Sequence, residues 1–105
     1  NPQDLIEMQR VAEQIHVAEP VLVYVQQLLA SSRVGATRPL SPRAGLAVLR
    51  ASRANALQVG RDHVLPDDVQ AVWTAVVSHR LGGGHDSIAK GMQLAQSLLH
   101  GVAAP

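Results

Sequence analysis

Apolar residues recur every three or four positions along most of the chain, which is the spacing that places side chains on one face of an α-helix. Together with capping signals, this pattern predicts five helices, at residues 2–16, 19–32, 42–59, 66–81 and 86–100. No segment shows the strict alternation that is typical of a strand, and only residues 61–65 are expected to be briefly extended. The pattern therefore predicts an all-α fold, a small helical bundle of four core helices and a C-terminal fifth.

Helix-boundary signals support these ranges. Ser41 is the predicted N-cap of the third helix, Pro42 occupies its first position, and Gly60 is the predicted left-handed terminator. Pro66 begins the fourth helix, and the glycines at 82–84 end it. The predicted inward faces of the first and fourth helices consist of Leu5, Met8, Ala12 and Ile15, and of Val69, Val72, Trp73, Val76 and Arg80.

Composition narrows the class of protein. The 105 residues suit one domain, and the absence of Phe, with one Trp and one Tyr, disfavours a base-stacking surface for single-stranded nucleic acid. No cysteine is present, which excludes disulfides and thiolate zinc sites and favours a cytoplasmic location. No apolar run approaches the roughly 20 residues of a membrane span, so none is predicted. A start at Asn-Pro rather than Met leads us to expect a piece of a longer protein.

Catalytic motifs are not visible in this chain. It contains no GxxxxGK[ST] phosphate-binding loop and no nucleophile elbow, so the isolated chain is not expected to be an enzyme. The histidines lack the spacing of metal ligands, and no metal site is predicted: they are His16, His63, His79, His85 and His100.

Arginines are concentrated in one segment, although the formal net charge is only +1. Five of them lie within residues 33–53, and Arg43 stands in the first turn of the third helix, where a positive charge is unfavourable by about 0.3–1 kcal/mol. Such an arginine is either tolerated in solvent or placed to meet an anion. Arg50 lies seven residues on and shares the face of Arg43, with Ala47 between them, whereas the simplest interpretation of Arg50 and Arg53 is that solvent covers their charges.

Motifs in this region resemble the C-terminal helical lid of the MoxR-type AAA+ ATPases. The matching motifs are Ser41-Pro42-Arg43, Gly60-Arg61-Asp62, Pro66-Asp67-Asp68-Val69 and His79-Arg80-Leu81. The chain departs from the family pattern at Pro39 and Leu40, where small residues are usual, and at Leu65, where Ser or Thr usually caps the fourth helix. The resemblance implies a lid bundle at residues 1–81, with a glycine loop and a C-terminal helix at 82–105 packed on it or extending it.

The same resemblance implies a function. Arg43 would be the sensor 2 arginine, with a catalytic role toward the γ-phosphate of ATP, and Ser41, Pro42 and Ala47 would lie beside the nucleotide. ATP and Mg²⁺ would be bound mainly by an upstream P-loop domain rather than by this chain alone. The parent protein would be an ATP hydrolase that forms a ring, expected to be a homohexamer, and remodels client proteins in a chaperone-like way, among them proteins with a von Willebrand factor A domain.

Three alternatives stay open at this point. The lid of a magnesium-chelatase-type AAA+ protein has a similar pattern. A small helical DNA-binding domain could use the arginines of residues 33–53 on phosphates, but the net charge of +1 argues against nucleic acid as a partner. A protein-interaction bundle could instead dock a partner on the helix of Trp73 or on the C-terminal helix.

Overall fold

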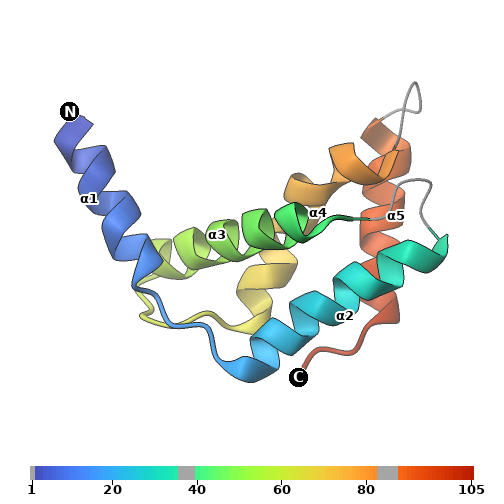
Figure 1. Ribbon diagram of the computed structural model, residues 1–105, viewed down its shortest axis with the longest axis horizontal. Helices are drawn as coiled ribbons and strands as arrows, with labels where there is room; N and C mark the ends of the chain where they lie inside the picture. The colour runs from blue at the N-terminus through green and yellow to red at the C-terminus, as the bar shows by residue number, and fades with distance from the viewer. Residues whose placement is uncertain (1, 36–39, 83–87) are drawn as a thin grey trace.

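The computed structural model describes residues 2–35, 40–82 and 88–105, and Figure 1 shows the arrangement of its helices. The helices are α1 (Pro2–Glu13), α2 (Glu19–Gly35), α3 (Pro42–Gln58), α4 (Pro66–Gly82) and α5 (Ile88–Gly101). These residues include no strand beyond one isolated bridge, which confirms the predicted all-α helical bundle. The predicted end of the second helix at residue 32 is wrong, because α2 continues to Gly35. The predictions for the glycines at 83–84 and for the helix start at 86 lie outside the described residues.

The centre of the bundle is α4, which packs against α2, α3 and α5. Trp73 of α4 is fully buried, and its indole N–H donates a hydrogen bond to the carbonyl oxygen of Ala95 in α5 at 2.9 Å. Tyr24 and Leu28 of α2 and Val48 of α3 complete the buried centre. Because the single tryptophan satisfies its polar atom inside this core, it joins α4 to α5 by both packing and a directed bond.

The buried face of α4 differs from the predicted one near its C-terminal end. Val69 and Trp73 are buried as expected, but the row continues through Val77 and Leu81. The prediction that Arg80 faces inward is wrong, because this residue is exposed. Its guanidinium donates a hydrogen bond to the carbonyl oxygen of Val76 in the same helix. Residues four positions apart do not lie exactly above one another, because the helix has 3.6 residues per turn. A line of such residues therefore winds slowly around the helix, and the neighbouring helices determine which line is buried.

The predicted inward face of α1 is also wrong at Leu5. This residue is 64% exposed and Ile6 is 53% exposed, because α1 packs only against α3 among the described elements and extends away from the other helices (Figure 1). Ile15, at the other end of that face, is buried as expected. The side chains of Met8 and Ala12 lie outside the described part of the structure.

Two connecting segments lie side by side and explain why the first helix ends earlier than residue 16. The N–H of His16 donates to the carbonyl oxygen of Asp62 at 3.0 Å, and the N–H of Val64 donates to the carbonyl oxygen of His16 at 2.8 Å. These bonds form the parallel bridge between His16 and His63 and confirm the short extended piece expected within residues 61–65. The backbone of His16 therefore pairs with the α3–α4 connection instead of continuing α1.

Gly60 ends α3 with a φ of +83°, which confirms the predicted left-handed terminator. Its N–H donates to the carbonyl oxygen of Leu57 at 3.0 Å, and the N–H of Arg61 donates to that of Ala56 at 2.9 Å. This pair of bonds is the Schellman motif. It reverses the chain at a point where residues with a Cβ atom are strained.

We expect Gly60→Ala to lower the free energy of unfolding by about 1–2 kcal/mol, because alanine is disfavoured at positive φ. A Cβ atom at Gly60 would meet no heavy atom within 4 Å, so the loss would be conformational rather than steric. Gly101→Ala is the matched control, since its Cβ atom also meets nothing within 4 Å and its φ is not positive. Urea unfolding of the three proteins measures the difference, and equal stabilities for both variants would contradict the prediction.

Candidate functional site

The N-terminus of α3 is the site that the sequence singled out. Ser41 is the N-cap in an extended conformation, with φ −84° and ψ 166°, and its side chain makes no capping hydrogen bond. Its carbonyl oxygen accepts the N–H groups of Ala44 at 3.0 Å and Gly45 at 3.4 Å. Pro42 has no N–H, and the N–H of Arg43 has no acceptor among the residues that the structure describes. This helix end therefore presents a hydroxyl and a backbone N–H without local partners.

Arg43 adds a full positive charge at the same place. Its side chain is exposed and makes no hydrogen bond or ion pair within residues 2–35, 40–82 and 88–105. The first turn of α3 contains no acidic residue that would neutralise the helix dipole. A helix N-terminus and a free guanidinium together are suited to an anion with several oxygens, such as a phosphate.

The other predicted residues of α3 differ in their surroundings. Ala47 is half-buried one turn beyond Arg43, and Arg50 is exposed on the same face without a partner in the described part of the chain. The prediction that solvent covers Arg53 is wrong, because this side chain is half-buried and its Nε donates to the carbonyl oxygen of Ile15 at 3.3 Å. Arg53 therefore ties the segment that follows α1 to α3 through its Nε.

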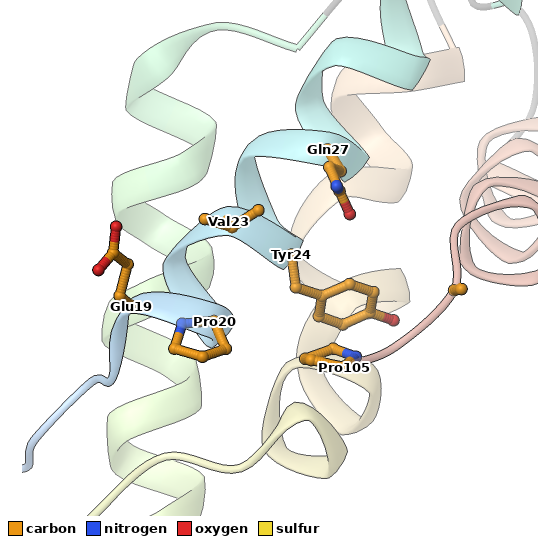
Figure 2. A pocket seen from close by; sticks show the side chains of 7 residues that line it. Glu19, Pro20, Val23, Tyr24, Gln27 and Pro105 are labelled. Carbon is orange, nitrogen blue, oxygen red and sulfur yellow. The ribbon is translucent and has the colours of Figure 1, made fainter.

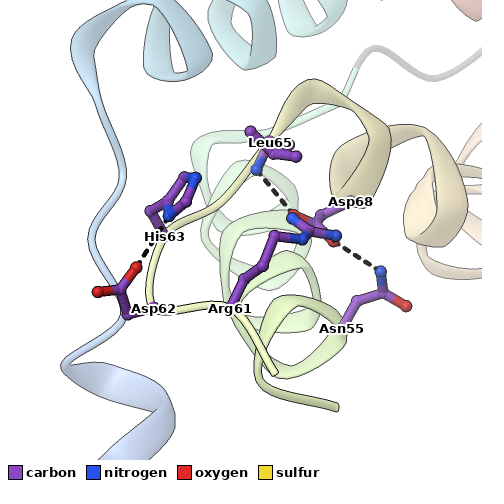
Figure 3. Close-up of polar contacts among 6 residues, drawn as sticks. All are labelled: Asn55, Arg61, Asp62, His63, Leu65 and Asp68. Carbon is purple, nitrogen blue, oxygen red and sulfur yellow. Dashed lines mark hydrogen bonds and ion pairs between the residues drawn. The ribbon is translucent and has the colours of Figure 1, made fainter. Parts of the chain in front are cut away.

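A second polar cluster, which was not among the predicted sites, lies at the opposite end of α3 (Figure 3). Asp68 is fully buried and accepts hydrogen bonds from both terminal nitrogens of Arg61, one of them at 2.8 Å. Asn55 donates to the same carboxylate at 2.8 Å, and the backbone N–H of Leu65 donates at 2.7 Å. This Asp68 cluster joins the end of α3, the connecting segment and the start of α4.

The sequence contained a local signal for part of this cluster. Leu65 cannot cap α4 with its side chain, but an acidic residue three positions later can accept the N–H of the N-cap residue, as in a capping box. Asp68 occupies that position and makes that bond. Its pairing with Arg61 and Asn55 could not be read from local spacing, because it depends on how the chain turns at Gly60.

The protonation of the cluster follows from its contacts. Burial alone raises the pKa of Asp68, but the hydrogen bonds from Arg61, Leu65 and Asn55 outweigh it and hold the pKa below the ordinary value. The same hydrogen bond from Arg61 to Asp68 raises the pKa of the guanidinium. Nearby, the exposed carboxylate of Asp62 has a lowered pKa, chiefly because His63 hydrogen-bonds to it at 2.9 Å.

These shifts predict acid sensitivity. A carboxyl group whose pKa is lower in the folded than in the unfolded chain stabilises the fold above about pH 4, and this stabilisation is lost as the pH falls through the folded pKa. We therefore expect the free energy of unfolding to fall more steeply between about pH 5 and pH 3 for the unchanged protein than for Asp68→Asn. Urea unfolding across this range measures the two slopes, and parallel slopes would contradict the assignment.

One pocket lies away from both the N-terminus of α3 and the Asp68 cluster (Figure 2). It has a volume of about 410 Å³ and is lined by Glu19, Pro20, Val23, Tyr24, Gln27, Ala103 and Pro105. The ring of Tyr24 faces Pro105, and its hydroxyl accepts a hydrogen bond from Gln70 at 3.3 Å. None of the residues predicted for nucleotide binding lines this pocket, so it is separate from the N-terminus of α3.

No group of three or more histidine, aspartate or glutamate side chains is placed to hold a metal ion in the described part of the chain. No helix there is both long enough and apolar enough to cross a membrane.

The sequence model of the AAA lid domain family matches residues 35–98, so the chain belongs to that family. Chaperone MoxR1 of Mycobacterium tuberculosis is 32% identical over 97 residues, which cover 82% of this chain and 26% of that protein. The uncharacterized protein YeaC of Bacillus subtilis is 30% identical over 81 residues, which cover 75% and 25%. The chain is thus a lid domain of the MoxR type, as the motifs indicated, and spans about a quarter of the length of these curated relatives.

A solved structure has the same fold. The crystal structure of a "putative ATPase" from Cytophaga hutchinsonii superposes with a TM-score of 0.80 over 98% of this chain and 36% of that protein, at 22% identity. The likeness extends through α5, so the arrangement of all the described helices recurs in that protein.

Proposed function

We propose that this chain is the lid of an AAA+ ATPase and that Arg43 is its sensor 2 arginine, which contacts the γ-phosphate of ATP bound mainly by a separate P-loop domain. The observation that carries the proposal is the exposed guanidinium of Arg43, which has no partner among the described residues and stands in a helix first turn without any acidic residue. Membership of the AAA lid domain family supports it.

The first turn of α3 has the donors that such a role needs. A planar guanidinium can donate to two phosphate oxygens at once, and the nearby helix N-terminus adds partial positive charge. Ser41 keeps its hydroxyl free of the helix, and the small side chain of Ala47 allows close approach on the same face. Because Arg43 has no partner to release in the described residues, its charge can turn toward a phosphate without breaking a contact in the lid.

ATP, when bound, supplies the phosphoryl group that is transferred to water. Arg43 would neutralise negative charge that develops on the phosphate oxygens, which is the main form of catalysis in phosphoryl transfer. The first turn of α3 offers no carboxylate to a magnesium ion, so Mg²⁺ would be held by the P-loop domain.

The wider assignment is part of the same proposal. The parent protein would form a homo-oligomeric ring, expected to be a hexamer in the cytoplasm, and remodel client proteins, including those with a von Willebrand factor A domain. A relative that is named as a chaperone supports the remodelling role. ATP hydrolysis by the full-length protein, with Arg43 intact and replaced, tests the proposal.

A further inference from the structure

A buried serine connects α2 to the residue that leads into α3. Ser32 is fully buried, and its hydroxyl donates to the carbonyl oxygen of Leu29 at 2.6 Å in its own helix. The same hydroxyl oxygen accepts the backbone N–H of Leu40 at 3.0 Å. Leu40 is itself buried, so this N–H depends on a protein acceptor, and Ser32 supplies it.

Little conformational freedom separates this bond from Arg43. Only Ser41 and Pro42 lie between Leu40 and Arg43, and Ser41 has a defined extended conformation. The ring of Pro42 restricts its φ to values near that of a helix. The position of the Leu40 N–H therefore determines where the first turn of α3 starts and in which direction its side chains point.

The first turn of α3 also packs against α2 at Gly45, two residues after Arg43. Gly45 is buried against α2, so closely that a Cβ atom at this position would stand 2.8 Å from Cδ1 of Leu29. Leu29 is also the residue whose carbonyl accepts the Ser32 hydroxyl. The same turn of α2 thus contacts the chain shortly before Arg43, at Leu40, and shortly after it, at Gly45.

We infer that Ser32 is a positioning residue for Arg43: its hydroxyl fixes the entry into α3 and thereby the place where the guanidinium is presented to phosphate. The inference rests on the function proposed for Arg43. Ser32 does not touch nucleotide, because it is buried inside the lid, and it acts only through Leu40 and the first turn of α3.

The test is made in the full-length ATPase with Ser32→Ala and a matched control, Ser52→Ala. Ser52 is also fully buried, and its hydroxyl donates to the carbonyl oxygen of Val48 in its own helix at 2.7 Å, but no hydrogen bond from another element to its hydroxyl is found in the described residues. We expect Ser32→Ala to lower kcat for ATP by about three- to tenfold, because small displacements of a catalytic group reduce the rate strongly. Ser52→Ala should leave kcat unchanged, and both variants should keep the affinity for ADP, which lacks the γ-phosphate.

A double-mutant cycle with Arg43→Ala separates positioning from general destabilisation. If Ser32 acts through Arg43, then Ser32→Ala has no further effect on kcat once Arg43 is replaced. An equal loss in both backgrounds, or a loss no greater than that of Ser52→Ala, overturns the inference and leaves the role of Arg43 intact. If Arg43→Ala alone leaves kcat unchanged, the proposed function fails, and this inference fails with it.

A second variant keeps the test decisive if the alanine variant does not fold. Ser32→Cys fills nearly the same space with a weaker hydrogen-bonding group. It is expected to reduce kcat by less than Ser32→Ala and to show the same dependence on Arg43. A folded Ser32→Cys protein with unchanged kcat would overturn the inference.

Discussion

Replacing Arg43 with alanine is expected to lower the kcat for ATP hydrolysis by the full-length protein about 100-fold, the effect of removing one preorganised donor to a developing negative charge. The lid itself should keep its stability within about 0.5 kcal/mol, because the side chain is exposed and makes no hydrogen bond or ion pair with the described residues. Steady-state kinetics and thermal unfolding of the same preparations measure the two effects separately.

Two further variants sharpen this experiment. Arg50→Ala removes a second exposed arginine from the same face of α3 and is expected to change kcat less than about twofold, since surface charges far from the reacting group act weakly. Arg43→Lys keeps the charge but not the planar pair of donors, and its kcat should lie between those of the alanine variant and the unchanged protein. Unchanged turnover in Arg43→Ala would remove the sensor role.

Replacing Asp68 with alanine is expected to destabilise the domain by about 3 kcal/mol, because it leaves three partly buried donors without their buried acceptor. Those donors are the Arg61 guanidinium, whose side chain is only 27% exposed, the Asn55 amide and the Leu65 N–H. The partial exposure of Arg61 lets water replace some of the lost contact, which places the expected loss at the lower end for a broken buried pair. Urea unfolding measures the free energy directly.

The neighbouring carboxylate provides the control. Asp67 is exposed in the same first turn of α4, where it favours the helix dipole and attracts Arg61 without a hydrogen bond, so Asp67→Ala should cost about 0.5 kcal/mol. Asp68→Asn, which retains one oxygen acceptor, should fall between the two. Equal losses in Asp67→Ala and Asp68→Ala would show that the Asp68 cluster does not stabilise the fold beyond the dipole.

Much of the fold could be predicted because helix ends depend on residues within a few positions of one another. Ser41-Pro42 begins a helix, Gly60 ends it, and Pro66 begins the next, as the local preferences of proline, serine and glycine require. The lack of an acidic partner for Arg43 within its own helix is also local in origin, since the first turn of α3 contains no acidic residue. The phosphate role of Arg43 stays a prediction from the family motif.

The sequence by itself thus determined the number of helices, most of their boundaries and the candidate anion site at the start of α3. Only the tertiary structure decided which faces are covered, so that Leu5 is exposed and Leu81 is buried. It also decided that Asp68 pairs with Arg61 and that Ser32 accepts the N–H of Leu40. The physical reason is that burial and buried hydrogen bonds depend on which elements the turns bring together, and the spacing of residues along one helix does not contain that information.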